Sequence, residues 1–294
     1  MFGAFLARAG HEVCLLDRHR RRADELARNG ILVERGDRTE RVAVHATVDP
    51  SACGRVDLVC VCVKAYDTQA AVRGACGLWA NDTVVVSLQN GLGNAEIIEQ
   101  AADPAQVVCG VTSQGATRLG PGHIRHAGAG PTRVASFRAQ AREAAEWLVS
   151  VLDQAGLNAQ LSDDAPGMLW SKLVVNAAVN PLTAIQGVPN GSLVDDPQLH
   201  RVMSDAAREA AAVARARRIR LEYPDAVAEA ERICRITHDN RSSMLQDVRQ
   251  GKRTEIDSIT GALLEEGRQA GVDTPVNAEL YARVREIEKR NRLA

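Results

Sequence analysis

The chain has 294 residues and carries 36 basic against 37 acidic side chains, so its formal net charge is -1. This length suits one large domain or two ordinary ones, and we expect two. Because acids and bases balance, the sequence excludes a strong electrostatic attraction to nucleic acid or to an anionic membrane, and it predicts a small-molecule partner.

The cysteines and the apolar segments bear on the compartment. Seven cysteines are scattered without the paired spacing of a metal site, and Cys60 and Cys62 fall inside an apolar strand pattern. We therefore predict reduced core thiols and no metal. No apolar run reaches the ~18 residues of a membrane-spanning helix, and the opening MFGAFLARAG lacks the basic start of a secretory signal. The sequence thus predicts a soluble cytoplasmic protein with no membrane or nucleic-acid partner.

The chain opens part-way through a nucleotide-binding pattern. Such an α/β unit normally begins with a strand, a glycine-rich turn and a helix that holds a pyrophosphate. Here residues 2–9 already predict the helix, and the strand EVCLLD follows, with no first strand and no G-x-G-x-x-G before them. The absent strand is central in the usual order, so its loss predicts an apolar gap between its neighbours. Either the true start lies upstream or the phosphate cradle is lost, and we favour an upstream start because the downstream sequence agrees with a working site.

The first half of the chain predicts an α/β architecture. Runs rich in β-branched residues occur at 12–16, 58–63, 83–88 and 106–110. They are continuous rather than alternating, which is typical of strands buried on both faces of a parallel sheet. Glycines and prolines crowd around short strand-like pieces at 123–126 and 133–136, and these predict antiparallel additions at the sheet edge.

The second half predicts helices alone. Helical periodicity runs through residues 197–217, 224–237, 254–270 and 277–290, and Thr254 with Asp257 resembles a capping box. We therefore predict a Rossmann-like, doubly wound parallel sheet, truncated at its N-terminus, followed by an all-α domain. The predicted domains are 1–165, which binds NADP, and 166–294, which binds substrate and carries the catalytic residues.

A polar stripe marks the segment KLVVNAAVNPLTAIQGVPNG. Lys172, Asn176 and Asn180 recur every four residues, so on a helix they share one face of an otherwise apolar segment. Each buried polar group left unpaired costs about 1 to 3 kcal/mol, and a bound polar ligand is one partner that would avoid this cost. The chain has only four lysines against 32 arginines, which makes a casual surface role for Lys172 a poor explanation.

Residues at the carboxyl ends of predicted strands are candidates for cofactor contacts. Asp17 and Arg18 end the second strand of the unit, where an acid accepts from ribose hydroxyls and an arginine pairs with a 2′-phosphate. Arg18 favours NADP, although the basic run to Arg22 is equally consistent with a solvated helix start. Lys64 and Asn90 end later strands, and the alternatives are a surface lysine and a simple Asn-Gly turn.

Two further candidates lie in the helical half. Glu255 in RTEIDSITG and Ser243 in NRSSMLQD are each consistent with an ordinary helix cap. In combination with Lys172 and the asparagines, they would supply a proton donor, its electrostatic partner and neutral donors for a carboxylate or hydroxyl. Neither Ser171 nor Ser243 has an evident histidine base nearby in the sequence, which makes acyl transfer a poor fit.

These motifs resemble one family, 2-dehydropantoate 2-reductase, also called ketopantoate reductase. The similarity covers the chain apart from the absent front. It depends most on KLVVNAAVNPLTAIQGVPNG and SSMLQDVRQGKRTEID, with support from SLQNGLGN and GVTSQGATRLGPGHIRHAG. The resemblance implies an NADPH-binding Rossmann domain and a helical substrate domain, with the active site in the cleft between them.

The resemblance also implies roles for individual residues. Lys172 resembles the general acid, and Glu255 the acid beside it that contacts cofactor or substrate. The implied substrate contacts are Asn176, Asn180, Asn190 and Ser243. The implied cofactor contacts are Asn90 and Ala116 on the nicotinamide side, and Arg18 and Lys64 on the adenosine phosphate side.

The implied reaction is a hydride transfer from NADPH to the C2 ketone of 2-dehydropantoate, with Lys172 donating the proton and pantoate as the product. This is a step of pantothenate and coenzyme A biosynthesis. One alternative is a related reductase of another 2-oxo acid, and another is a non-catalytic truncated homologue. Whether the protein is a monomer or a homodimer stays open at this point.

Overall fold

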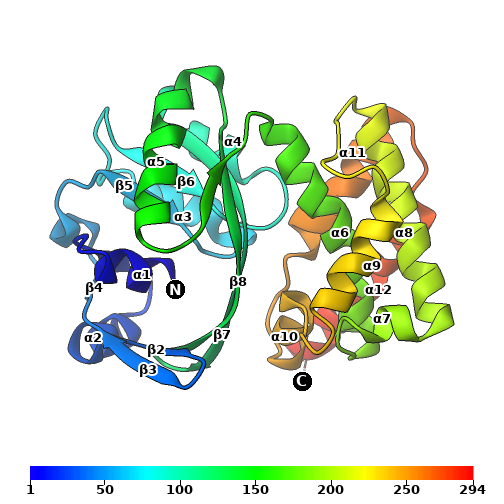
Figure 1. Ribbon diagram of the computed structural model, residues 1–294, viewed down its shortest axis with the longest axis horizontal. Coiled ribbons are helices and arrows are strands. Elements are labelled where there is room, and N and C mark those ends of the chain that lie inside the picture. The colour runs from blue at the N-terminus through cyan, green and yellow to red at the C-terminus, as the bar shows by residue number, and fades with distance from the viewer. Residues whose placement is uncertain (294) are drawn as a thin grey trace. The chain divides into compact units, whose positions relative to one another are not determined.

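The computed structural model describes residues 1–293, with the side chains of residues 1–291. The chain forms two compact units (Figure 1). The first comprises Met1–Val63, Asp67–Gln89 and Ala95–Ala165, and the second comprises Lys64–Tyr66, Asn90–Asn94 and the chain from Pro166 onward. Two short segments after strands of the sheet therefore belong to the helical unit. The roles predicted for the domains 1–165 and 166–294 stay predictions.

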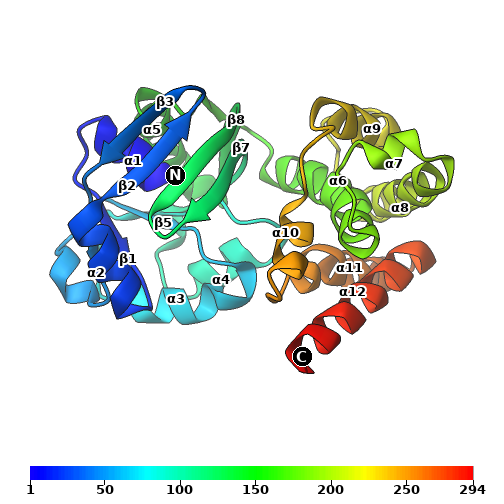
Figure 2. The same ribbon diagram turned by 90° about the horizontal axis from the view of Figure 1, so that it is seen from below.

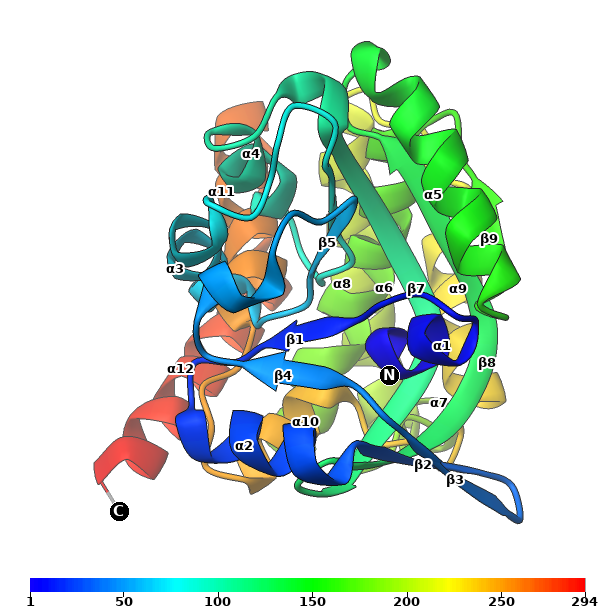
Figure 3. The same ribbon diagram turned by 90° about the vertical axis from the view of Figure 1, so that its left-hand side faces the viewer.

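A seven-stranded sheet forms the centre of the first unit (Figure 3). Its order is β3 (Arg38–Val42), β2 (Ile31–Arg35), β8 (His123–Ser136), β7 (Val107–Gly120), β6 (Val84–Ser87) and β5 (Leu58–Val61), and β9 (Ala159–Leu161) pairs with β8. Strands β5, β6 and β7 run parallel, and every residue of β6 is buried. The doubly wound α/β class is confirmed. Burial on both faces is confirmed for β6 but is wrong for β5, in which only Val61 is buried.

Strands β7 and β8 differ from the prediction. Each has 14 residues, and they pair antiparallel along most of their length. We expected short pieces at the sheet edge, which is wrong, because β8 lies inside the sheet between β7 and β2. The physical reason is the hairpin of β2 and β3, which adds to the outer side of β8 through residues 32–34 and covers it.

A second, two-stranded sheet accompanies the large one. Strand β1 (Cys14–Leu16) pairs in parallel with β4 (His45–Thr47), and among the described residues no ladder joins β1 to β5. Helix α1 (Phe2–Arg8) packs closely on this small sheet, because a Cβ on Gly3 would lie 2.9 Å from Leu15 Cδ2. Phe5 of α1 and Leu15 nevertheless share one apolar core with Leu58 of β5. The predicted first helix and the strand after it are confirmed.

Helices and turns complete the α/β part of the chain. They are α2 (Arg20–Asn29), α3 (Thr68–Ala75), α4 (Asn94–Glu99) and α5 (Arg142–Gln154), with 3-10 turns at Pro50–Cys53, Ala65–Asp67, Pro104–Gln106 and Ala139–Ala141. Helix α5 buries Leu148 and Leu152 completely, in the same core as Val86 and Val134 of the sheet. Helix α5 thus lays its apolar face on the sheet, beside β8 and β9 (Figure 3).

The cysteines do not all follow their prediction. Cys14 of β1 and Cys53 form a disulfide. Cys62 is exposed, while Cys109 and Cys234 are buried thiols. The prediction of reduced core thiols is therefore wrong for the Cys14–Cys53 pair and for Cys62 and Cys76, which are both exposed. The reason is tertiary: the pairing of β1 with β4 brings residue 14 to the turn that follows β4, 39 residues later in the chain.

The second unit is helical throughout the described chain, as predicted (Figures 1 and 2). Its helices are α6 (Ala165–Gln186), α7 (Ser192–Asp195), α8 (Pro197–Ala216), α9 (Ala226–Ile236), α10 (Ser243–Arg249), α11 (Ala262–Ala270) and α12 (Pro275–Leu293), with a π-helical turn, η5 (Asp257–Gly261), before α11. Asp196 and Asp225 cap α8 and α9 by accepting backbone N–H groups. None of the described helices is both long and apolar enough to cross a membrane.

The helix start near Thr254 differs from the predicted capping box. The Thr254 N–H donates to Glu288 at 2.7 Å, and Asp257 accepts from Tyr281 at 2.8 Å. The two residues therefore do not cap each other. Glu288 and Tyr281 lie on α12, and only the tertiary structure brings them to Thr254 and Asp257.

Candidate functional site

The polar stripe lies on α6, as its four-residue spacing predicts. Lys172 is half-buried, whereas Leu173, Val174 and Ala177 around it are almost wholly buried in the core of the second unit. Burial lowers the pKa of Lys172 to about 8, and the nearby Glu255 carboxylate opposes that fall. Lys172 is thus an ammonium group that can release a proton near neutral pH.

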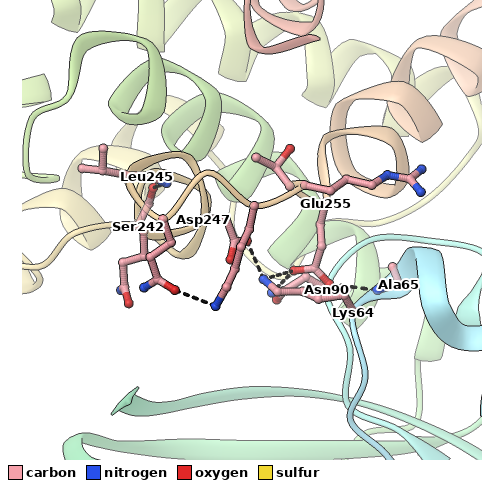
Figure 4. A network of polar contacts seen from close by, with 12 residues as sticks. Lys64, Ala65, Asn90, Ser242, Leu245, Asp247 and Glu255 are labelled. Carbon is pink, nitrogen blue, oxygen red and sulfur yellow. Dashed lines mark hydrogen bonds and ion pairs between the residues drawn. The ribbon is translucent and has the colours of Figure 1, made fainter. Parts of the chain in front are cut away.

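Glu255 lies between α10 and the π-helical turn, and its side chain is only 7% exposed. Its carboxylate accepts the Ala65 N–H at 3.1 Å, and Lys64 Nζ lies 3.4 Å away. Asn90 Nδ2 is at 3.5 Å from the same group (Figure 4). Glu255 is therefore surrounded by donors from two loops that follow strands β5 and β6.

Lys64 bridges two carboxylates. Its Nζ lies 2.6 Å from Asp247 Oδ2 of α10 and also contacts Glu255 (Figure 4). Burial alone would lower the pKa of Lys64, but the charges of Glu255 and Asp247 raise it above the ordinary value. Burial raises the pKa of Asp247, and Lys64 limits that rise. Lys64 therefore stays charged where Lys172 can lose its proton.

A glycine places Asn90 beside Glu255. Gly91 has φ +85°, and a Cβ at this position would lie 2.3 Å from the backbone oxygen of Ser258. The next residue, Leu92, donates its N–H to that same oxygen at 3.0 Å. The chain therefore bends at Asn90 and Gly91, and its close backbone approach to η5 needs a residue without a side chain.

The remaining residues predicted to bind substrate lie in the second unit. Asn176 and Asn180 share the face of α6 with Lys172, half-buried and buried respectively. Asn190 Nδ2 donates to Thr237 at 2.9 Å, and its buried Oδ1 has no hydrogen-bond partner among the described residues. The cap of α10 is Ser242, which accepts from the Leu245 N–H, and Ser243 beside it is exposed.

The other residues predicted to bind cofactor lie in the first unit. Arg18 follows β1, is 67% exposed and pairs with Asp67 at 2.9 Å. Asp17 is bound by Arg22; although burial raises the pKa of Asp17, the hydrogen bonds from Arg22 and from the His19 N–H hold it below its ordinary value. Ala116 is exposed on β7, opposite His126 on β8.

Comparison with known proteins decides the family. Residues 1–139 match the family model for "Ketopantoate reductase PanE/ApbA", and residues 164–288 match "Ketopantoate reductase PanE/ApbA C terminal". The chain belongs to the ketopantoate reductase family. The 2-dehydropantoate 2-reductase of Archaeoglobus fulgidus is 37% identical to it over 288 residues, which cover 98% of this chain and 94% of that protein.

Solved structures agree with this family. The crystal structure of a PanE/ApbA family ketopantoate reductase from Ralstonia eutropha JMP134 is similar with a TM-score of 0.89 and 36% identity, covering 99% of this chain and 95% of that one. D-mandelate dehydrogenase in a ternary structure with NADH and anilino(oxo)acetate gives a TM-score of 0.93 and 27% identity, with the same coverage. The predicted family resemblance and fold class are confirmed.

One residue of this polar cluster, Asp247, is not among the residues predicted from the sequence. Asp247 was part of the motif SSMLQDVRQGKRTEID but was not singled out. It follows Met244 by three residues and precedes Val248, so it lies on the apolar side of α10. An acid on the buried face of a short helix needs a partner, and this pattern could have identified Asp247 as a site residue.

The assembled groups can support proton transfer in a ketopantoate reductase. Lys64, Lys172, Asp247 and Glu255 come from four separate segments, and their formal charges nearly cancel. The pKa of Lys64 is raised by its carboxylate partners, whereas that of Lys172 is lowered to about 8. Within the described chain, no group of three or more His, Cys, Asp or Glu side chains is arranged to hold a metal ion. The chemistry that this cluster favours is the protonation of an oxygen that gains negative charge.

Proposed function

We propose that this chain is an NADPH-dependent 2-dehydropantoate 2-reductase, which reduces ketopantoate to pantoate in the biosynthesis of pantothenate and coenzyme A. The observation that carries the proposal is the half-buried Lys172 on the polar face of α6, with a pKa of about 8 and Glu255 as its electrostatic partner. The Archaeoglobus fulgidus relative supports the substrate, since it bears that name and matches nearly the whole chain.

Lys172 is the proton donor in this proposal. The ketone oxygen of the substrate gains negative charge as the C2 carbon is reduced, and the Lys172 ammonium stabilises that charge before it transfers its proton. Because burial lowers the pKa of Lys172 to about 8, the proton is released more readily than from a solvated lysine. Glu255 prevents the pKa from falling so far that Lys172 would be neutral before the reaction.

The carboxamides hold the substrate without adding charge. Asn176 and Asn180 lie on the same face of α6 as Lys172, so they can donate to the carboxylate and hydroxyl of a substrate whose ketone faces the ammonium. Asn190 retains a buried, unpartnered Oδ1 that can accept from a hydroxyl. Ser243, exposed at the first position of α10, adds a hydroxyl donor.

The residues present fit a nicotinamide cofactor. When bound, it supplies the hydride. Arg18 is an exposed cation at the carboxyl end of β1, where a 2′-phosphate is recognised, and it supports NADPH over NADH. The close packing of Gly3 on Leu15 is of the kind that the last glycine of a dinucleotide-binding turn permits. Asn90 and Ala116 are proposed for the nicotinamide side.

The role that we propose for Lys64 differs from the one that the family resemblance implied. We expected it on the adenosine phosphate side. Its ammonium is already held by Asp247 and Glu255, and an ammonium with two carboxylate partners has little charge left for a phosphate. We therefore propose that Lys64 acts beside Glu255, where it fixes that carboxylate and the Ala65 N–H next to it.

One other function has specific support. The similarity to D-mandelate dehydrogenase, with a TM-score of 0.93, favours a reductase of another 2-oxo acid as the alternative. A non-catalytic homologue is the third possible function. All three share the fold, so only turnover separates them.

A substrate panel tests the function. We expect NADPH oxidation by the purified full chain with 2-dehydropantoate to exceed that with phenylglyoxylate, an aryl 2-oxo acid, by at least about 100-fold in kcat/KM, which corresponds to about 2.7 kcal/mol. A preference for the aryl acid would replace the proposed substrate. Absence of NADPH oxidation with every 2-oxo acid would favour the non-catalytic homologue. Repeating the assay with NADH tests the proposed cofactor preference.

A further inference from the structure

Helix α12 forms hydrogen bonds to the segment that carries Glu255. Glu288 accepts two hydrogen bonds from Thr254, the residue before Glu255: from its N–H at 2.7 Å and from its hydroxyl at 2.8 Å. The side chain of Glu288 is only 3% exposed. Burial of a carboxylate to this degree costs folding free energy unless hydrogen-bond donors compensate it. The fold therefore depends on the hydrogen bonds from Thr254 to Glu288.

The same helix also holds the residue on the other side. Tyr281 donates to Asp257 at 2.8 Å, and Arg285 Nη1 lies 3.2 Å from Asp257 and 2.9 Å from Glu288. Residues 281, 285 and 288 follow the i, i+4, i+7 spacing of one helix face. That face therefore binds residues 254 and 257, which bracket Glu255 and Ile256 (Figure 2 shows α12 beside α10 and α11).

The backbone after Glu255 departs from an ordinary helix. Residues Asp257–Gly261 form a π-helical turn, a geometry that is frequent at functional sites because it redirects side chains. Ser258 bonds the Glu255 carbonyl through its hydroxyl at 3.1 Å, and its own carbonyl accepts from Leu92. Small movements of Thr254 or Asp257 would therefore move Glu255 relative to Lys64 and Asn90.

We propose that Glu288 is a positioning residue of this reductase: its carboxylate fixes Thr254 and, through Arg285, Asp257, and thereby sets where the Glu255 carboxylate lies. The inference rests on the proposed function for its kinetic consequences only. Glu288 takes no part in the chemistry, since its partners are Thr254 and Arg285.

Displacement of Glu255 would alter the proton donor. The charged groups that act on Glu255 are Lys64, Lys172 and Asp247. Asp247 also binds Lys64, and Lys252 acts on Asp247. Glu255 opposes the fall in the pKa of Lys172. Moving its carboxylate away therefore lowers the pKa of Lys172 further, because burial then acts with less opposition.

The central test is Glu288→Gln, which keeps one acceptor oxygen but removes the charge. We expect kcat/KM for the 2-oxo acid to fall about 10-fold, since misplacement of a catalytic group by about 1 Å costs up to 100-fold. We also expect the pH at which kcat declines to move downward. Thr254→Val removes the hydroxyl donor and should act through the same bond, so its effect and that of Glu288→Gln should be less than additive.

Two controls on the same helix separate positioning from stability. Glu286→Gln changes an exposed glutamate, and its kinetics should match the wild type. Leu280→Ala removes a core side chain and should lower Tm without moving the pH profile. If Glu288→Gln lowers kcat only in proportion to its Tm, as Leu280→Ala does, or leaves the pH profile at the wild-type position, the proposal is overturned.

A readout without turnover keeps the proposal apart from the proposed function. The chain has four lysines, so the side-chain carbon signals of labelled lysine are few enough to follow by NMR, with Lys172→Arg as the assignment variant. Glu288→Gln should lower the Lys172 pKa measured in this way. If Glu288→Gln lowers the Lys172 pKa but the protein reduces no 2-oxo acid, the proposed function is rejected and the positioning role of Glu288 is supported. If the pKa is unchanged but the protein is an active reductase, the positioning role is rejected and the function is supported.

Discussion

The two units place similar ionic groups in different surroundings. In the second unit, Lys64 contacts Asp247 and Glu255, whose side chains are 11% and 7% exposed. In the first unit, the Arg18 guanidinium that pairs with Asp67 is 67% exposed. Buried charges set each other's protonation, whereas water and salt screen exposed ones. The proton donor proposed in the second unit should therefore respond to its neighbouring charges, whereas the contribution of Arg18 should depend on salt.

The largest effect should come from removing the proton donor. Lys172→Ala should lower kcat by about 10² to 10⁴-fold, the usual contribution of a general acid, while the Kd of NADPH changes little. Steady-state kinetics and a fluorescence titration with NADPH measure the two quantities. Lys289→Ala, at an exposed lysine of α12, is the matched control. Equal losses of turnover and of NADPH affinity would mean that Lys172 has a structural role instead.

The pH dependence should follow the charge of Lys172. Reduction needs its protonated form, and burial lowers its pKa to about 8, so kcat should be constant below that pH and decline as the pH rises through it. Glu255→Gln removes the charge that opposes the fall, and the decline should then begin at lower pH. A pH series of kcat for both proteins checks the direction. A profile that moves upward, or stays in place, contradicts the assigned coupling.

Breaking the buried ion pair should cost more stability than breaking an exposed one. Asp247→Asn leaves the half-buried Lys64 with Glu255 as its remaining carboxylate partner, and we expect a loss of about 1 to 3 kcal/mol in the free energy of unfolding. Asp82→Asn breaks the exposed pair with Arg55, and the loss expected there is smaller because water screens both charges. Urea denaturation of both variants measures the difference. Equal losses would show that burial is not the deciding factor.

The smallest effect should come from the exposed arginine. Arg18→Ala should weaken NADPH binding by about 3- to 10-fold, or roughly 0.7 to 1.4 kcal/mol, and leave NADH binding nearly unchanged. The effect should shrink as salt is added, because Arg18 is exposed. Arg55→Ala, another exposed arginine of the first unit, is the control. If NADPH and NADH affinities fall equally, Arg18 does not read the 2′-phosphate.

Local patterns in the sequence predicted much of the fold. The strands β5 and β6 were visible because both are continuous apolar runs, although only β6 is buried along its whole length. The hairpin of β2 and β3 was missed, and its omission is the reason that β8 was placed at an edge. The Cys14–Cys53 disulfide was missed for a similar reason, since the pairing of β1 with β4 is not written in either segment alone.

The candidate site, too, was predictable from the sequence only where it depends on local patterns. The sequence alone determined that Lys172, Asn176 and Asn180 share one face of a helix, because the helical period is a local property of the chain. Only the tertiary structure decided that Lys64 meets Asp247, 183 residues away, and that Thr254 is held by Glu288 rather than by Asp257. The pKa of Lys172 belongs to this second group as well, because burial and neighbouring charge come from segments that are distant in the sequence.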